Sequence, residues 1–359
     1  MTGLYIHIPF CRQKCFYCDF FSVRYDEDLA KNYVDALLIW LENFRGEKIE
    51  TVYIGGGTPS VLDISQIEKL LSSISKNFDL SNIKEWTIEA NPESLSLAKL
   101  KIFKDFAVDR LSLGLQSAND AHLKKLGRVH SFDDFRKVFE NALSIGFKKI
   151  NIDLIYGFEG QTFLDFQESL NILAEFRSPH LSLYPLSISP RTPFYNEGLK
   201  TDDDLQADFY EFACKFLADN GYIHYEISNW AMVGMEALHN TNYWRNCEYI
   251  GAGAGASGYW KRHRYKIVAD IGEFIGQVRR GGNIFSSKEF IDDTLFRREK
   301  IMLGLRLLNE GVGIENFPFE QKSILNKFLC DGLLINDRGK IKLSQKSVFL
   351  SNAIICEFL

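Results

Sequence analysis

The chain of 359 residues lacks any long hydrophobic run. No stretch approaches the roughly 20 apolar residues that a helix needs to cross a bilayer. Its start, "MTGLYIHIPF", has no basic segment followed by a long apolar stretch, which is the pattern of a secretory signal. We therefore expect a cytoplasmic protein with no transmembrane segment.

An excess of basic residues is also missing, because 42 Lys and Arg stand against 47 Asp and Glu, a net charge of -5 at pH 7. Nucleic-acid binding rests on clustered Lys and Arg, so we do not expect nucleic acid as a partner. The composition is that of a soluble globular protein, and the length suffices for a large domain with an appendage or for two domains.

An even set of cysteines is missing too, since the chain has seven, without regular spacing beyond the first three. A disulfide framework needs an even number, so this count suits a reducing compartment. We expect the scattered cysteines to be small buried hydrophobic side chains; they are Cys214, Cys247, Cys330 and Cys356.

Short apolar runs that end in polar or glycine-rich sequence recur along the first half of the chain. They are "LYIHIP", "TVYIGGG", "EWTIEAN", "RLSLGLQS", "INIDLIYG" and "HLSLYPL", and we expect them to be strands. Segments with helical spacing lie between them, at residues 29–44, 64–74, 95–106, 132–145 and 163–176. Strand then helix, repeated about six times, predicts an α/β fold, and we favour a parallel (β/α)6 partial TIM barrel over an open sheet.

The pattern changes after "YPLSISPRTPFYNEG", whose prolines and glycine break the alternation. An amphipathic helix is predicted over residues 205–219, with "TDDDL" as its N-terminal cap. From about residue 292 the chain is helix-rich, and it closes with a predicted hairpin and helix. We expect a core barrel over 1–200, an extension packing on the barrel over 201–290, and a smaller helical, winged-helix-like domain over 291–359.

Three cysteines stand close together in "YIHIPFCRQKCFYCDF", at Cys11, Cys15 and Cys18. A structural zinc site requires four ligands. Three thiolates, in contrast, can bind three irons of a 4Fe-4S cluster and leave the fourth iron without a protein ligand. S-adenosylmethionine can chelate that iron, and an electron from the cluster then releases a deoxyadenosyl radical. The alternatives are a zinc site completed by His7 or Asp19, or three unrelated thiols.

Aromatic residues flank these cysteines. Tyr17 lies where an adenine could pack against its ring. Phe16 and Phe20 either shield a cluster from water or simply pack.

Polar residues and glycines recur at the ends of the predicted strands, where parallel barrels carry their chemistry. In "GGGTPS" the absent side chains let the backbone approach a ligand, and we expect its NH groups to face a carboxylate. Singly, each polar residue is more often a solvated strand end or a satisfied core group, but their recurrence predicts a site. The residues are Gly55, Gly56, Gly57, Thr58, Glu89, Gln116 and Asp153.

Together "YIHIPFCRQKCFYCDF", "GGGTPS", "IEANP", "LSLGLQS", "NIDLIYGFEGQT" and "LSLYPL" resemble the radical S-adenosylmethionine family of oxygen-independent coproporphyrinogen III oxidases and their relatives. The resemblance spans roughly the first 260 residues. It implies that Cys11, Cys15 and Cys18 bind the cluster, and that further residues surround one or two S-adenosylmethionine molecules. These are Tyr5, Tyr17, Gly56, Gly57, Thr58, Glu89, Gln116, Arg128 and Asp153, with Arg128 assigned from its register in "LKKLGRVH".

Within that family the chain resembles the haem-chaperone branch. The oxidases carry a further cysteine soon after the third and an extension before the first strand, whereas here Asp19 and Phe20 follow and the first predicted strand starts at residue 3. "HNTNYW" matches the signature of the chaperone branch, which implies His239 as a candidate haem-iron ligand. The alternative for His239 is a histidine that satisfies a loop or caps a helix. Tyr243 and Trp244 are either porphyrin walls or core residues.

The resemblance also extends to the glycine-alanine run "GAGAGASG", over residues 251–258. In the family this run lies near the adenosine. Close packing of backbone against backbone is the alternative.

The function implied is a haem chaperone that binds haem and delivers it to respiratory haem apoproteins, using a 4Fe-4S cluster and S-adenosylmethionine, without coproporphyrinogen oxidase activity. The implied partners are haem, acceptor apoproteins, some of them at the membrane surface, and an electron donor, and a homodimer is allowed. One rival is an oxygen-independent coproporphyrinogen III oxidase, which decarboxylates propionates to vinyl groups. Another is a radical enzyme that acts on a different tetrapyrrole.

Overall fold

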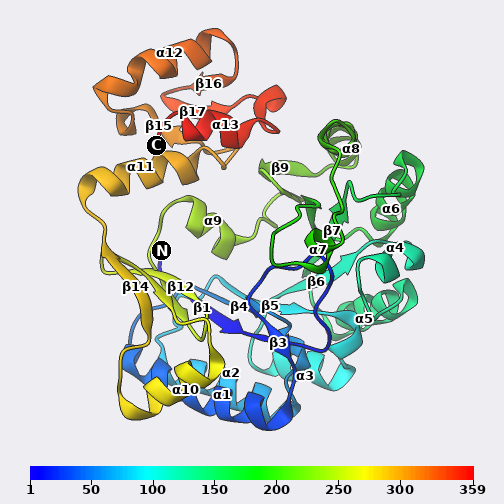
Figure 1. The fold of residues 1–359 in the computed structure, drawn as a ribbon, viewed down its shortest axis with the longest axis vertical. Helices are drawn as coiled ribbons and strands as arrows, with labels where there is room; N and C mark the ends of the chain where they lie inside the picture. Colours follow the sequence, from blue (N-terminus) through cyan, green and yellow to red (C-terminus); the bar gives the residue numbers. More distant parts are fainter.

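The computed structural model describes residues 1–359 and is built on one 12-stranded sheet, ordered β14-β13-β12-β11-β1-β4-β5-β6-β7-β8-β10-β9 (Figure 1). Six strands at its centre follow chain order, and each pairs in parallel with the next. They are β1 (Gly3–Ile8), β4 (Thr51–Gly56), β5 (Glu85–Ala90), β6 (Arg110–Gln116), β7 (Lys149–Tyr156) and β8 (His180–Pro185). The predicted α/β fold with a parallel (β/α)6 core is confirmed.

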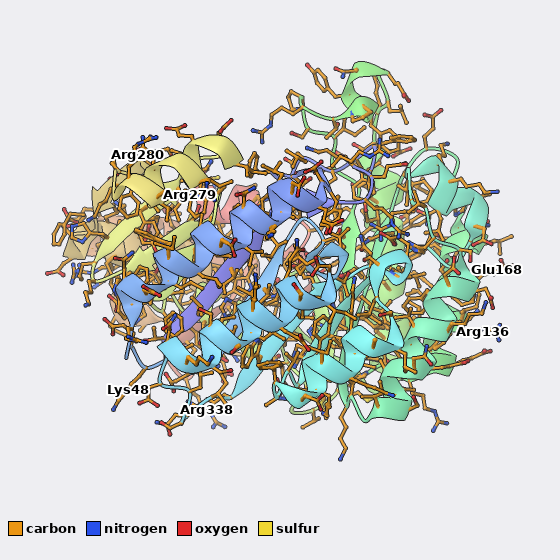
Figure 2. All side chains as sticks on the ribbon, turned by 90° about the horizontal axis from the view of Figure 1, so that it is seen from below. Lys48, Arg136, Glu168, Arg279, Arg280 and Arg338 are labelled. Carbon is orange, nitrogen blue, oxygen red and sulfur yellow. The ribbon has the colours of Figure 1, made fainter.

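Helices between these strands cover the outer face of the sheet, as Figure 2 shows from below. They are α1 (Glu27–Leu41), α2 (Ile64–Asn77), α3 (Leu97–Asp105), α4 (Asp120–Lys125), α5 (Phe132–Ile145) and α6 (Phe163–Phe176). Arg136 of α5 and Glu168 of α6 point into solvent there. The predicted bounds of α5 and α6 are confirmed, while α1 begins two residues early because Asp26 caps it by accepting from the Leu29 N–H.

The central strands alternate between an apolar and a polar face. In β5, Trp86 and Ile88 belong to the hydrophobic core under the helices, whereas Thr87 and Glu89 face the barrel interior and line a cavity there. Successive side chains of a strand point to opposite faces, so one sequence serves both purposes. TIM barrels usually fill the interior with branched apolar side chains, and a polar interior instead leaves room for a ligand.

Residues after β8 extend the sheet at both edges. β9 (Ile223–Glu226) and β10 (Asn229–Ala231) join β8, while β11 (Tyr249–Ala252), β12 (Ser257–Trp260), β13 (His263–Ile267) and β14 (Phe285–Phe290) join β1. The helices of this region are α7 (Pro193–Asn196), α8 (Asp203–Asp219), α9 (Leu238–Trp244) and α10 (Ile271–Arg280). Asp202 caps α8 by accepting from the Leu205 N–H, as "TDDDL" predicted.

The C-terminal part of the chain, from α11 on, forms a separate small layer, drawn orange to red in Figure 1. It comprises α11 (Asp293–Gly304), β15 (Val312–Gly313), α12 (Lys322–Cys330), β16 (Leu334–Asp337), β17 (Lys340–Leu343) and α13 (Ser351–Cys356). The predicted closing hairpin and helix are β16, β17 and α13. The three strands form an antiparallel sheet, ordered β15-β17-β16, that helices flank as in a winged helix. The divisions at residues 200 and 290 stay predictions.

Short elements complete the chain. Strands β2 (Phe10–Cys11) and β3 (Val23–Arg24) pair with each other, and single 3-10 turns lie at Glu42–Phe44, Pro59–Val61, Pro92–Ser94, Ile314–Asn316, Phe319–Gln321 and Gln345–Ser347. No helix combines the length and the apolar character that a bilayer crossing requires.

The expectation of four buried scattered cysteines was wrong for two of them. Cys330 and Cys356 are exposed, because each is the last residue of a short helix, α12 or α13, in the thin C-terminal layer. Cys214 and Cys247 are partly buried.

The glycine-alanine run at 251–258 packs backbone against backbone. A Cβ on Gly251 would lie 1.9 Å from the Ser257 carbonyl oxygen, and one on Gly253 would lie 2.3 Å from the Tyr33 hydroxyl. None of the run lines the cavity in the barrel. The structure therefore supports the packing alternative for this run.

We predict that Gly251→Ala lowers the free energy of unfolding by about 1–3 kcal/mol, because the new methyl group overlaps a backbone carbonyl. The matched control is Gly272→Ala in α10, where the nearest atom to the new Cβ is 3.4 Å away. This control should raise the free energy of unfolding by about 0.5–1 kcal/mol, since alanine loses less backbone entropy than glycine. Urea unfolding of both variants measures the difference, and equal free energies would contradict the packing role.

Candidate active site

A cavity of about 410 Å³ opens where the six parallel strands end. Side chains from the cysteine loop, the strand ends and the interior of the barrel line it. The structure brings together the following predicted site residues: Cys11, Cys15, Cys18, Tyr17, Gly56, Gly57, Thr58, Glu89, Gln116, Arg128 and Asp153. Tyr5 and His239 are not among its lining residues.

The cysteine loop is held at both ends. Its first residues form β2, which pairs with β3 beyond the loop, and Phe10 is buried against Tyr33 with ring centroids 5.5 Å apart. In the middle, the Phe16 N–H donates to the Leu126 carbonyl at 3.1 Å. The three thiols are therefore presented on a loop tied down by its neighbours.

Two thiols accept hydrogen bonds from the cavity wall. Thr58 Oγ1 donates to Cys11 Sγ at 3.5 Å, and Arg128 Nη1 donates to Cys15 Sγ at 3.4 Å. Burial raises the pKa of Cys11, and it raises the pKa of Cys18 to about 11. Donors placed at the sulfur atoms favour thiolate, the form that binds metal.

The donor set fits a cluster better than a single ion. No three His, Cys, Asp or Glu side chains are close enough together to hold one metal ion. Both ring nitrogens of His7, the candidate zinc ligand, have hydrogen-bond partners: Nδ1 bonds the Tyr5 hydroxyl at 2.8 Å, and Nε2 bonds the Phe21 carbonyl at 2.9 Å. Three separated thiols suit a cubane cluster, in which each cysteine binds its own iron.

Arg128, assigned from its register in "LKKLGRVH", lines the polar wall of the cavity. Besides Cys15, it donates from Nη2 to Asn91 Oδ1 at 2.8 Å and to the Gly114 carbonyl at 2.7 Å. One side chain thus joins the cysteine loop to the ends of β5 and β6.

Two buried carboxyl groups face the cavity. Glu89 accepts from the Tyr53 hydroxyl at 2.6 Å and from the Gly56 N–H at 3.0 Å, and burial raises its pKa to about 7. Asp153 accepts from Asn151 Nδ2 at 2.8 Å and from Ser112 Oγ at 3.2 Å, and burial raises its pKa as well. Perturbed carboxyl groups in a cavity are typical of a functional site.

Gln116 ends β6 in a strained conformation. Its φ of 74° lies in the left-handed region, and the pairing of β6 with β7 shifts register between Gly114 and Gln116. Non-glycine residues held in this region cluster at ligand sites, where the surrounding structure enforces the strain.

The NH groups of "GGGTPS" bond partners inside the protein, and the one at Gly56 faces a carboxylate, that of Glu89. The Gly56 N–H is used by Glu89, the Gly57 N–H by the Ile8 carbonyl and the Thr58 N–H by the Phe10 carbonyl. The glycines are required instead by close packing, since a Cβ on Gly56, whose φ is +111°, would lie 2.5 Å from the His7 ring. The turn contributes its bare backbone surface and the Thr58 hydroxyl.

The aromatic residues of the loop divide into two roles. Tyr17 lines the cavity and packs on a small apolar cluster that includes Leu126 and Phe194. Phe16 packs on Phe194, with ring centroids 6.1 Å apart. Phe20 is 64% exposed, so in this conformation it offers little shielding from water.

His239 lies at the opposite end of the barrel from the cysteines. Its Nδ1 bonds Thr51 Oγ1, in the first residue of β4, at 2.9 Å, and its Nε2 bonds the Tyr243 hydroxyl at 2.7 Å. The six residues of β4 separate the two ends by roughly 20 Å. Burial lowers the pKa of His239 to about 3, so the ring is neutral. Both nitrogens are satisfied inside the protein, and haem ligation by His239 stays a prediction.

Several cavity residues escaped the sequence analysis. They lie on inward positions of the central strands β5 to β8, and they are Thr87, Arg110, Ser112, Asn151, His180 and Ser182. The period of two along each strand was the available signal, because counting back from Glu89 and Asp153 leads to Thr87 and Asn151.

Comparisons with known proteins give a consistent family. A family model described as the radical SAM superfamily matches residues 5–173. A protein described as heme chaperone HemW from Lactococcus lactis is 38% identical over 100% of this chain and 97% of its own, and one of the same description from Bacillus subtilis is 34% identical over 100% and 99%. The crystal structure of the radical SAM enzyme coproporphyrinogen III oxidase (HemN) from Escherichia coli aligns with a TM-score of 0.87 at 23% identity, over 99% of this chain and 89% of that one. At that identity the last match shows the fold alone.

We predict that Glu89→Gln removes part of the pH dependence of stability. A carboxyl group with a folded-state pKa near 7 and an ordinary value of 4.5 stabilises the fold most below its ordinary pKa, and this stabilisation is lost as pH rises toward 7. Between pH 4 and pH 8, the free energy of unfolding of the unmodified protein should therefore fall relative to that of Glu89→Gln, by up to about 3 kcal/mol. Urea unfolding at both pH values measures it, and a pH-independent difference would contradict the raised pKa.

Proposed function

The chain belongs to the radical SAM superfamily and, within it, to the HemW family, and on that premise we propose that it is a haem chaperone that binds haem and delivers it to respiratory haem apoproteins. The observation that carries the proposal is the end-to-end similarity to relatives described as haem chaperones. We propose further that the protein works with a 4Fe-4S cluster and S-adenosylmethionine.

Three thiols on one tethered loop support the cluster. Cys11, Cys15 and Cys18 would each hold one iron, and the fourth iron would accept the amino and carboxylate groups of S-adenosylmethionine. Thr58 and Arg128 donate to two of the sulfurs, which stabilises the thiolates and tunes the cluster. Cluster and S-adenosylmethionine together supply one-electron chemistry when bound.

The polar wall supports a place for S-adenosylmethionine beside the thiols. Glu89 and Asp153 offer acceptors for an ammonium group and ribose hydroxyls, and Gln116 and Tyr17 face the same space. Tyr5 would act through His7 and Tyr53, because it bonds the His7 ring and packs on Tyr53 with ring centroids 6.2 Å apart.

Haem contact through His239 would require local opening. Either the bond to Thr51 or the bond to Tyr243 must break before a ring nitrogen can reach an iron atom. The proposal therefore pairs haem loading with a movement of α9.

We predict that the protein, reconstituted anaerobically with its cluster, binds haem and forms neither harderoporphyrinogen nor protoporphyrinogen from coproporphyrinogen III. Haem titration followed by absorbance measures the first, and product analysis with S-adenosylmethionine and a reductant measures the second. Cys15→Ala serves as the control for cluster-dependent turnover, since it removes one iron ligand. Clear decarboxylation by the unmodified protein that Cys15→Ala abolishes would overturn the chaperone proposal in favour of the oxidase.

We predict that His239→Ala weakens haem binding and leaves the iron-sulfur absorbance intact. The substitution also leaves the Thr51 and Tyr243 hydroxyls without their partner, so the free energy of unfolding should fall by about 1–3 kcal/mol.

Tyr243→Phe is the matched variant, because it frees Nε2 while keeping the imidazole. If His239 ligates the iron, Tyr243→Phe should retain or strengthen haem binding, although it destabilises the fold. Unchanged haem affinity in folded His239→Ala would remove His239 from the haem site.

A further inference from the structure

Asn91 connects the two side chains that hydrogen-bond the cysteine sulfurs. It directly follows β5 and lines the cavity. Its Oδ1 accepts from Arg128 Nη2 at 2.8 Å, and its Nδ2 donates to Thr58 Oγ1 at 3.0 Å. Arg128 in turn donates to Cys15 Sγ, and Thr58 donates to Cys11 Sγ. One amide group therefore contacts both sulfur donors.

The chemistry of the groups fixes the direction of these hydrogen bonds. A guanidinium group has N–H donors and no acceptor, so the oxygen of the Asn91 amide must face Arg128. The NH2 of the same amide then faces Thr58, whose hydroxyl oxygen accepts from it. Because that oxygen accepts, the Thr58 hydroxyl keeps its hydrogen for Cys11 Sγ, 3.5 Å away. The position of Arg128 thus determines, through Asn91, that Thr58 donates to the sulfur.

The main chain of Asn91 is held independently of its side chain. Its N–H donates to Ser60 Oγ at 3.1 Å, and its carbonyl accepts from the Ser94 N–H at 3.1 Å. Ser60 and Ser94 also bond each other through their hydroxyls at 2.7 Å. Lys99 Nζ donates to the carbonyls of both serines, at 2.6 and 3.0 Å. A substitution that changes only the amide of Asn91 leaves all these bonds in place.

Arg128 is held in one orientation beside Asn91. The Gly114 carbonyl also accepts from Arg128 Nη2, at 2.7 Å, so Nη2 has two acceptors while Nη1 donates to Cys15. Gly114 has no side chain to obstruct this arrangement, since a Cβ there would lie 2.7 Å from Asn91 Oδ1 and 3.3 Å from Arg128 Nη2. The two bonds to Nη2 therefore direct Nη1 at the sulfur.

Hydrogen bonds to thiolate sulfur change the reduction potential of an iron-sulfur cluster. They withdraw electron density from the sulfur and stabilise the reduced, more negative cluster more than the oxidised one, which raises the potential. Two of the three candidate cluster ligands, Cys11 and Cys15, receive such a bond. A residue that holds both donors is therefore placed to control the potential.

We propose that Asn91 is a positioning residue that holds Thr58 against Cys11 and Arg128 against Cys15, and that it thereby sets the reduction potential of the cluster. The inference rests on the proposed function in one respect, because it requires the 4Fe-4S cluster proposed above. It adds a residue that binds no iron and acts through two others.

The test uses the full-length protein, reconstituted anaerobically with its cluster. Asn91→Leu keeps the branched shape of the side chain and removes both of its hydrogen-bonding groups. One-electron reduction of the cluster should become about tenfold less favourable, the effect of about one hydrogen bond to a charged group. This factor corresponds to a potential about 59 mV more negative. A redox titration followed by electron paramagnetic resonance of the reduced cluster measures it.

Asn43→Leu is the matched control. Asn43 lies in the turn Glu42–Phe44, bonds the Trp40 carbonyl at 2.9 Å and does not line the cavity. The same substitution there should leave the potential unchanged.

A double-mutant cycle with Thr58→Val separates positioning from a general packing effect. Thr58→Val removes the donor to Cys11 and should itself lower the potential, whereas Thr58→Ser keeps the hydroxyl and should lower it much less. If Asn91 acts through Thr58, Asn91→Leu should lower the potential less in the Thr58→Val protein than in the unmodified protein. Additive shifts would overturn the proposal, because the two residues would then act independently.

The remaining outcomes separate this inference from the proposed function. An intact cluster with an unchanged potential in Asn91→Leu would overturn the inference and leave the proposed function standing. Failure of the unmodified protein to assemble a 4Fe-4S cluster would overturn both. If Asn91→Leu alone fails to assemble its cluster, Asn91→Ala, which adds no branched side chain, takes its place with the same expected shift.

Discussion

The period of two along six parallel strands is the constraint on which the rest of the structure depends. Residues such as Leu111, Leu113 and Ile152 turn outward and form the core beneath the helices, while Arg110, Ser112 and Asp153 turn inward. Because the strands pair in register, the inward residues form layers, and their polarity keeps the barrel interior open to ligands. Core and cavity are two faces of the same strands.

The buried pair of Glu85 and Arg110 joins this barrel to the segment that follows β10. Glu85 accepts from the first N–H groups of α9, and Arg110 binds the carbonyls just before that helix. From the other end of α9, Trp244 meets Arg306 at 5.4 Å in a cation-π contact. Figure 1 shows α9 between the main sheet and the C-terminal layer. Breaking one partner of such a buried pair is costly, so the pair holds α9 in place.

Local sequence predicted much of the fold and part of the site. The helices at 132–145 and 163–176 and the six central strands followed from periodicity and from turn residues, which act over short distances. The thiols and the polar strand ends followed from chemistry and spacing. The partners of the "GGGTPS" NH groups did not follow from spacing, because the Gly56 N–H bonds Glu89 and the Gly57 N–H bonds the Ile8 carbonyl, both distant in the chain.

The sequence alone singled out the candidate residues for the chemistry: three thiols within eight residues, and two carboxyl groups at or near strand ends. Only the tertiary structure decided how they are used. It set His239 against Thr51, 188 residues away, and so at the far end of the barrel from Cys11. It also buried Arg110 and left its Nη1 without a hydrogen-bond partner. The reason is physical: burial and hydrogen bonding depend on which distant segments of the chain come into contact. A local sequence pattern does not identify those contacts.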